Sequence, residues 1–195
     1  MKRIITLLLS VILSACSIKI NLTNDNINPE PKYYTINNFE EFKQQFPIEA
    51  TQIEANVDYF LNAVNMDRTY REFNESYHYI DGEIDWELYA DISDFKTWKC
   101  YAEMKEENNQ VVMNVSYISF TTPDKVDYDL LQKMARVMGY NALQISKLYE
   151  NYLEEYQTEG KVRQEIQLDK YNKVVFAYTR SPNGNSLMID MIRNL

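Results

Sequence analysis

A row of acidic side chains falls on one face of a predicted strand, and these carboxylates are the first candidates for chemistry. Residues 83–92 alternate strictly between apolar and polar types, which is typical of a half-buried strand. The polar face carries Glu83, Asp85, Glu87, Tyr89 and Asp91. Two carboxylates at a set separation can hydrolyse a glycosidic bond, and several together can bind Ca²⁺. The tendency of half-buried strands to turn polar residues outward favours a solvated face with neither function.

Tyrosine gives the same face a second candidate chemistry, which is recognition. The chain holds 16 tyrosines and 2 tryptophans in 195 residues, and both residue types are enriched at protein interfaces. Tyr89 falls on the acidic face, and alternation places Tyr101 on the outward face of the next predicted strand. A patch of tyrosine and carboxylate fits a basic protein or a carbohydrate. The competing interpretation is that most tyrosines replace phenylalanine in the core.

Nucleophilic, metal and phosphate chemistry find little support in the sequence. His78 is the single histidine, and Cys100 lies in an alternating segment that predicts an inward-facing thiol. A catalytic pair needs a base within hydrogen-bond reach of the nucleophile, and no pattern indicates one. One histidine and one such cysteine cannot complete a zinc site, and none of the four glycines belongs to a phosphate loop. We therefore expect no enzyme, no metal and no cofactor.

The elements that position these residues follow from changes in hydrophobic period. A helical region with a break at Pro47 precedes a series of antiparallel strands, and a second helical region broken near Gly139 precedes three short strands. The predicted ranges are 39–66, 77–120, 124–160, 162–168, 173–179 and 186–192. This order predicts a two-layer α+β fold, α-β(3-4)-α-β(3), with antiparallel meanders packed against helices. Two related halves remain an alternative, although no residue-level repeat is visible.

The most specific motif lies in residues 1–16. A cationic start is followed by an apolar run, 4–15, that is shorter than the roughly 20 residues of a membrane-spanning helix. Such a segment is typical of a secretory signal, and Leu13-Ser14-Ala15-Cys16 resembles the lipobox of bacterial lipoproteins. The resemblance implies that Cys16 receives a diacylglyceryl group, that cleavage follows Ala15, and that the acyl chains hold the protein on a membrane. The alternative is an ordinary secretory signal in which Cys16 is incidental.

These features predict the organisation and address of the chain. We expect a signal peptide over 1–15, a lipidated cysteine with an Asn- and Pro-rich flexible tether over 16–32, and one domain over 33–195. The absence of aspartate after Cys16 favours the outer membrane in a diderm cell. In a monoderm cell the address is the outer face of the plasma membrane.

Charge narrows the choice of partners. Loss of Lys2 and Arg3 with the signal changes the formal net charge from −9 to −11. An acidic surface repels nucleic acid, so the expected partners are the membrane, through the lipid, and a protein, which the charge favours as basic.

Three functions are compatible with these observations. The first is a non-catalytic envelope lipoprotein whose acidic, Tyr-rich domain binds a protein, for example as an immunity or inhibitor protein. The second is a carrier of a lipid or sugar ligand, which predicts a large apolar cavity between the layers. The third is a carboxylate-dependent hydrolase of envelope glycans, which predicts two carboxyl groups converging in a cleft.

Overall fold

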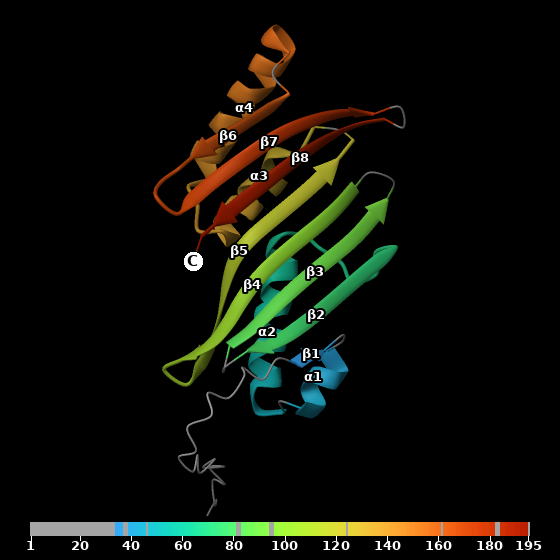
Figure 1. The fold of residues 1–195 in the computed structure, drawn as a ribbon, viewed down its shortest axis with the longest axis vertical. Coiled ribbons are helices and arrows are strands. Elements are labelled where there is room, and N and C mark those ends of the chain that lie inside the picture. The colour runs from blue at the N-terminus through green and yellow to red at the C-terminus, as the bar shows by residue number, and fades with distance from the viewer. Residues whose placement is uncertain are drawn as a thin grey trace, which may run out of the picture. The chain divides into compact units, whose positions relative to one another are not determined.

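One antiparallel sheet organises the part of the chain that the structure describes. The computed structural model describes residues 34–36, 39–45, 47–80, 83–93, 96–123, 125–160, 162–181 and 184–194. The strands are β1 (Tyr34–Ile36), β2 (Glu72–Ile80), β3 (Glu83–Ser93), β4 (Lys96–Glu107), β5 (Gln110–Thr122), β6 (Arg163–Gln167), β7 (Asn172–Ser181) and β8 (Gly184–Arg193). The helices are α1 (Phe39–Gln45), α2 (Pro47–Ala63), α3 (Tyr128–Val137) and α4 (Ala142–Glu159). The eight described strands lie in the order β1-β2-β3-β4-β5-β8-β7-β6 (Figure 1).

Local sequence fixes the hairpin between β4 and β5. Asn108 and Asn109 both adopt positive φ, at 54° and 62°. A two-residue turn with positive φ at both positions matches the twist of antiparallel strands, and asparagine tolerates that conformation. The turn sets the register in which Glu107 pairs with Gln110, and this register continues as far as Ala102 opposite Val115.

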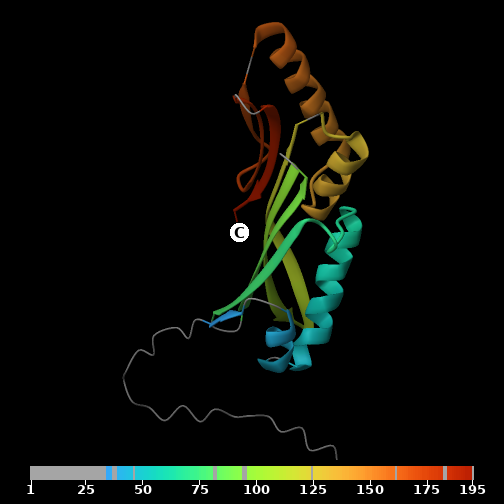
Figure 2. The same ribbon diagram turned by 90° about the vertical axis from the view of Figure 1, so that its right-hand side faces the viewer.

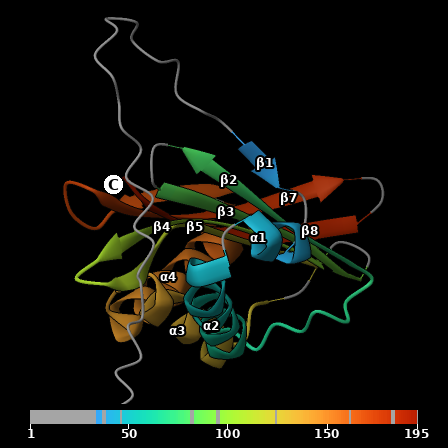
Figure 3. The same cartoon turned by 90° about the horizontal axis from the view of Figure 1, so that it is seen from below.

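The helices lie on one face of the sheet and leave the other face open. Figures 2 and 3 show α2, α3 and α4 on the same side of the strands. Large side chains fill the layer between them, because Phe60 of α2 packs edge-on against Trp86 of β3 at 5.3 Å, and Tyr149 of α4 contacts Phe176 of β7 at 5.5 Å. Each of these four side chains is buried. The sheet therefore has a dry face under the helices and an open face.

Helix ends agree with the sequence in three places and disagree in one. Gly139 and Gly160, both at φ 69°, follow the ends of α3 and α4 as predicted, since glycine adopts the left-handed conformation without a steric penalty. The predicted start of the second helical region at residue 124 is wrong: α3 begins at Tyr128, where the side chain of Asp127 accepts a hydrogen bond from the N–H of Asp129. The predicted break before Pro47 matches the end of α1 at Gln45.

The predicted fold class, a two-layer α+β domain with order α-β-α-β, is wrong. The two expected meanders are parts of one continuous sheet, because β5 pairs with β8 from Tyr117–Ile192 to Thr122–Leu187. Strands hold more of the described chain than helices do, and a strand, β1, precedes the first helix. Two helices and two strands separate β5 from β8 in the sequence. Local hydrophobic periodicity does not indicate a contact between segments so far apart. β1 has three residues, too few for alternation to reveal.

The signal peptide and the lipid anchor stay predictions. Ala15, Cys16 and the tether over 16–32 lie outside the described residues. Among the helices that the structure describes, none is both long and apolar enough to span a bilayer.

Candidate functional site

The predicted acidic row lies on the open face of β3. Glu83 and Glu87 are exposed, and Asp85, Tyr89 and Asp91 are half-buried. The residues between them are buried under the helices, namely Ile84, Trp86, Leu88 and Ala90. The alternation in sequence therefore gave the correct orientation of this strand.

Neighbouring strands bring part of that row together around a shallow hollow. In the antiparallel register Ser76 of β2, Glu87 of β3 and Tyr101 of β4 are direct neighbours. The hollow has a volume of about 360 Å³, and its lining includes Asn74, Ser76, Glu87, Tyr89, Lys99 and Tyr101. Glu83, Asp85 and Asp91 lie on the same strand but do not line it. Three of the six predicted site residues, Glu87, Tyr89 and Tyr101, thus share one surface.

Tyr117 of β5 extends this surface and was missing from the sequence-based prediction. The rings of Tyr101 and Tyr117 lie 5.4 Å apart, and the Tyr117 hydroxyl donates to Oδ1 of Asp190 at 3.3 Å. Burial raises the pKa of the Tyr117 phenol above its ordinary value, so this donor keeps its proton. Asp190 is itself buried. Tyr117 is thus held in place by Asp190 and supports the ring of Tyr101. The side chain of Tyr101 is 40% exposed.

A β-bulge explains why alternation did not identify Tyr117. Met113 and Val115 face the helices, and a strict period of two would place Tyr117 on that side as well. The register of β5 against β4 shifts between Tyr101 and Ala102, where Ser116 is the extra residue. The residues beyond the bulge change faces, so Ile118 is buried under the helices and Tyr117 lies on the open face.

The two residues considered for nucleophilic chemistry lie on opposite faces of the sheet. Cys100 is fully buried on the helix side, and burial raises the pKa of its thiol. His78 lies on the open face, with its Nε2 4.0 Å from Oε2 of Glu87. No Cys-His pair can form across the sheet. Among the described residues, no group of three or more His, Cys, Asp or Glu side chains is arranged to hold a metal ion.

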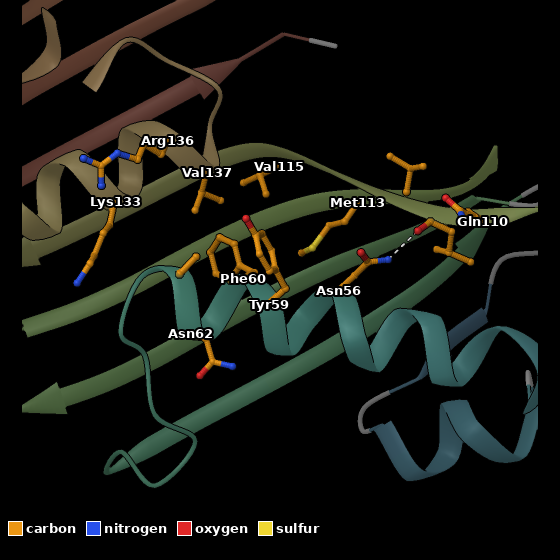
Figure 4. A pocket seen from close by; sticks show the side chains of 13 residues that line it. Asn56, Tyr59, Phe60, Asn62, Gln110, Met113, Val115, Lys133, Arg136 and Val137 are labelled. Atoms are coloured by element: carbon orange, nitrogen blue, oxygen red, sulfur yellow. Dashed lines mark hydrogen bonds between the residues drawn. The ribbon is translucent and has the colours of Figure 1, made fainter. Parts of the chain in front are cut away.

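The helix side carries a second surface, a groove between α2 and α3. It measures about 680 Å³, and the strand β5 lies along it. Figure 4 shows Tyr59 and Phe60 of α2 on one wall, Val137 of α3 near Val115, and Gln110 at the opposite end from Arg136. Tyr59 is 75% exposed. The charged residues that line the groove are two cations, Lys133 and Arg136. Sequence reasoning missed this groove because α2, β5 and α3 meet only in the folded chain.

Comparison with known proteins supplies no relative. Protein-family models, curated proteins and solved structures were each compared with the chain, and none matches. The functional argument therefore rests on the two surfaces. Both are open and offer aromatic, amide and charged groups, an arrangement that suits recognition of another molecule.

Proposed function

We propose that the chain is a membrane-anchored envelope lipoprotein whose non-catalytic domain binds a protein through the open face of its sheet. The observation that carries the proposal is the exposed Tyr101, whose ring packs at 5.4 Å against the tilted ring of Tyr117 beside the hollow that Glu87 helps to line. A tyrosine that is held rigidly by its neighbours offers a large contact area at a low entropic cost. Immunity or inhibition is one concrete form of such binding.

The charge of this face supports a basic partner. Glu87 is exposed beside Tyr101, and the exposed Glu83 and half-buried Asp85 precede it on the same face of β3. Exposed carboxylates of one sign accelerate the approach of a cationic protein, and the effect weakens as salt rises. Lys99 also lines the hollow, so the contact presents one cation among the acids and favours a partner with a complementary carboxylate at that point.

The carrier and hydrolase alternatives receive less support. Large side chains, including Trp86, Trp98 and Phe176, are buried between the helices and the sheet. The groove of about 680 Å³ between α2 and α3 is open and has Lys133 and Arg136 in its lining, whereas a carrier needs an enclosed, mainly apolar cavity.

A hydrolase needs two carboxyl groups that converge on one bond. Two carboxylate residues line the hollow, Glu87 of β3 and Glu75 of β2. Glu75 lies opposite the buried Leu88 and accepts a hydrogen bond from Nε1 of Trp86 at 3.2 Å, so its carboxylate lies on the helix side of the sheet and does not converge with that of Glu87.

The substitution Tyr101→Ala tests the binding face. We expect it to weaken capture of the envelope partner by about 30-fold, about 2 kcal/mol, because rigid interfacial tyrosines act as hot spots. The measurement is a titration of the immobilised domain with the protein that wild type captures from envelope extract at low salt. The matched control is Tyr171→Ala, a tyrosine that is 52% exposed between β6 and β7. Equal affinity of the two variants, or no capture by wild type, would count against the proposal.

The anchor is tested on the N-terminus of the mature protein. We expect mass spectrometry to find a first residue Cys16 that carries a diacylglyceryl thioether, with the protein in the membrane fraction. The substitution Cys16→Ser removes the acceptor thiol and is expected to abolish lipid incorporation completely, because no other atom of the lipobox can form the thioether. An unmodified Cys16 thiol in protein released to the medium would refute the anchor and leave the binding face unaffected.

A further inference from the structure

The strand β5 has an unpaired backbone edge beside the groove between α2 and α3. β8 pairs with β5 from Thr122 only as far as Tyr117. Beyond Ile192 the chain of β8 stays with β7, where Arg193 pairs with Asn172. Along Gln110–Ser116, β5 has β4 on one side and, among the described residues, no strand on the other.

Two side chains of α2 establish which backbone groups point to that edge. The N–H of Val111 donates to Oε1 of Gln52 at 2.6 Å, and the carbonyl of Val111 accepts from Nδ2 of Asn56 at 2.7 Å. The contact with Asn56 is drawn in Figure 4. These two amide groups occupy the positions that the backbone of a further strand would occupy. In an antiparallel ladder the direction of the backbone groups repeats every second residue, so Met113 and Val115 also direct their N–H and C=O groups outward.

The vacant edge has a defined length. It begins after Val111, whose backbone N–H and C=O bond to side chains of α2, and ends before Tyr117, which pairs with β8. The intervening five residues, Val112–Ser116, span about 17 Å at about 3.4 Å per residue. Exposed edges of this kind readily pair with another extended chain.

The walls of the groove specify the chemistry of the occupant. Tyr59, Ala63 and Val137 line the groove and keep apolar surface exposed beside the edge. An added strand would direct alternate side chains toward them, so these positions require apolar residues. The α3 end of the groove has Lys133 and Arg136 and no lining carboxylate. Lys133 contacts the carboxylate of Asp129 at 2.6 Å, whereas the exposed Arg136 donates a hydrogen bond to the neutral Oε1 of Gln132 at 3.1 Å. Arg136 therefore favours a carboxylate on the occupant.

We propose that an extended segment of the protein partner adds as a strand to β5 along Val112–Ser116, with apolar side chains in the groove and a carboxylate near Arg136. This proposal rests on the proposed function in one respect, namely that the occupant belongs to a protein. It adds a second contact, on the opposite side of the sheet from Tyr101. Main-chain pairing supplies the affinity in this mode, and the alternate side chains supply the specificity.

A synthetic peptide tests the edge without the natural partner. The probe is acetyl-DTVTVTV-amide at millimolar concentration, and its matched control is acetyl-KTVTVTV-amide. We expect the acidic peptide to slow amide hydrogen exchange at Met113 and Val115 by about tenfold or more, since each amide gains a hydrogen bond. Val112 and Asn114, which face β4 by the same alternation, should change little. Unchanged exchange at Met113 and Val115 would overturn the proposal, even if Tyr101→Ala behaves as expected.

Three variants separate backbone pairing from side-chain effects. Met113→Pro removes the outward N–H without removing a bond to β4, and proline is tolerated at such edge positions. Met113→Ala removes the same side chain but keeps the backbone N–H. Only the proline variant should therefore fail to bind the acidic peptide. Should Met113→Pro fail to fold, the exposed substitution Arg136→Glu decides. This substitution is expected to lower the affinity for the acidic peptide by about tenfold and to raise the affinity for the basic peptide. Equal binding of both peptides by Arg136→Glu would overturn the charge assignment.

Discussion

The substitution Trp86→Ala is expected to destabilise the domain by about 4 kcal/mol, a large fraction of the stability of a typical domain. Trp86 is fully buried, and its ring meets Phe60 of α2 edge-on at 5.3 Å. Removal of the indole leaves a cavity between β3 and α2 that rigid neighbours fill only in part. Urea unfolding followed by circular dichroism should show a midpoint lower by about 2 M, with a slope of about 2 kcal/mol per M.

A hydrogen bond of Trp86 adds to the loss of stability expected for Trp86→Ala. A second variant can separate the contribution of this hydrogen bond from that of packing. The indole Nε1 of Trp86 donates to Oε1 of Glu75 at 3.2 Å, and Nε of Arg68 lies 3.5 Å from the other carboxylate oxygen. Burial raises the pKa of Glu75, while Arg68 and Trp86 lower it. Trp86→Phe keeps an aromatic ring but removes the donor, so we expect a loss of about 1–3 kcal/mol. Free energies of unfolding within about 0.5 kcal/mol of wild type for both variants, the range of an ordinary surface substitution, would mean that the surroundings of Trp86 are not part of the cooperative core.

The orientation of β3 and of the start of β4 could be read from the sequence because it depends on local burial. Ile84 and Leu88 alternate with Glu83 and Glu87, and water on one face with helices on the other enforces that pattern. The order of strands in the sheet could not be read in this way. Tyr117 and Ile192 are 75 residues apart, and their pairing depends on how β8 returns past two helices. Local periodicity carries no information on that return, so the single sheet was missed.

The candidate surfaces were predictable to the same extent as the elements beneath them. Glu87 and Tyr101 were placed on one surface because both lie on regularly alternating strands. Tyr117 was missed because the bulge at Ser116 reverses the faces of β5. The edge along Met113 and Val115 was missed for a different reason: it is defined by where β8 leaves β5, and no residue of β5 marks that point. A local sequence pattern predicts which face of the sheet a side chain lies on. Prediction of an unpaired strand edge requires knowledge of the order in which the strands pair.

The second large effect is expected at Tyr149, where packing and hydrogen bonding can be separated by two substitutions. Tyr149 of α4 is fully buried between Tyr128 and Phe176, at ring distances of 5.9 and 5.5 Å. Its hydroxyl accepts a hydrogen bond from the buried N–H of Val126 at 2.9 Å. Tyr149→Ala removes both interactions and is expected to cost about 4 kcal/mol in the free energy of unfolding.

Tyr149→Phe removes only the hydroxyl and leaves the N–H of Val126 buried without its acceptor, so we expect a loss of about 1–3 kcal/mol. Burial raises the pKa of Tyr149 to about 12, and the phenol therefore stays neutral at physiological pH. The measurement is urea unfolding of both variants beside Tyr128→Phe, whose side chain is 40% exposed and should change by less than about 0.5 kcal/mol. If Tyr149→Phe were as stable as wild type, the hydroxyl would be dispensable, and tyrosine at this position would be acting only as a phenylalanine in the core.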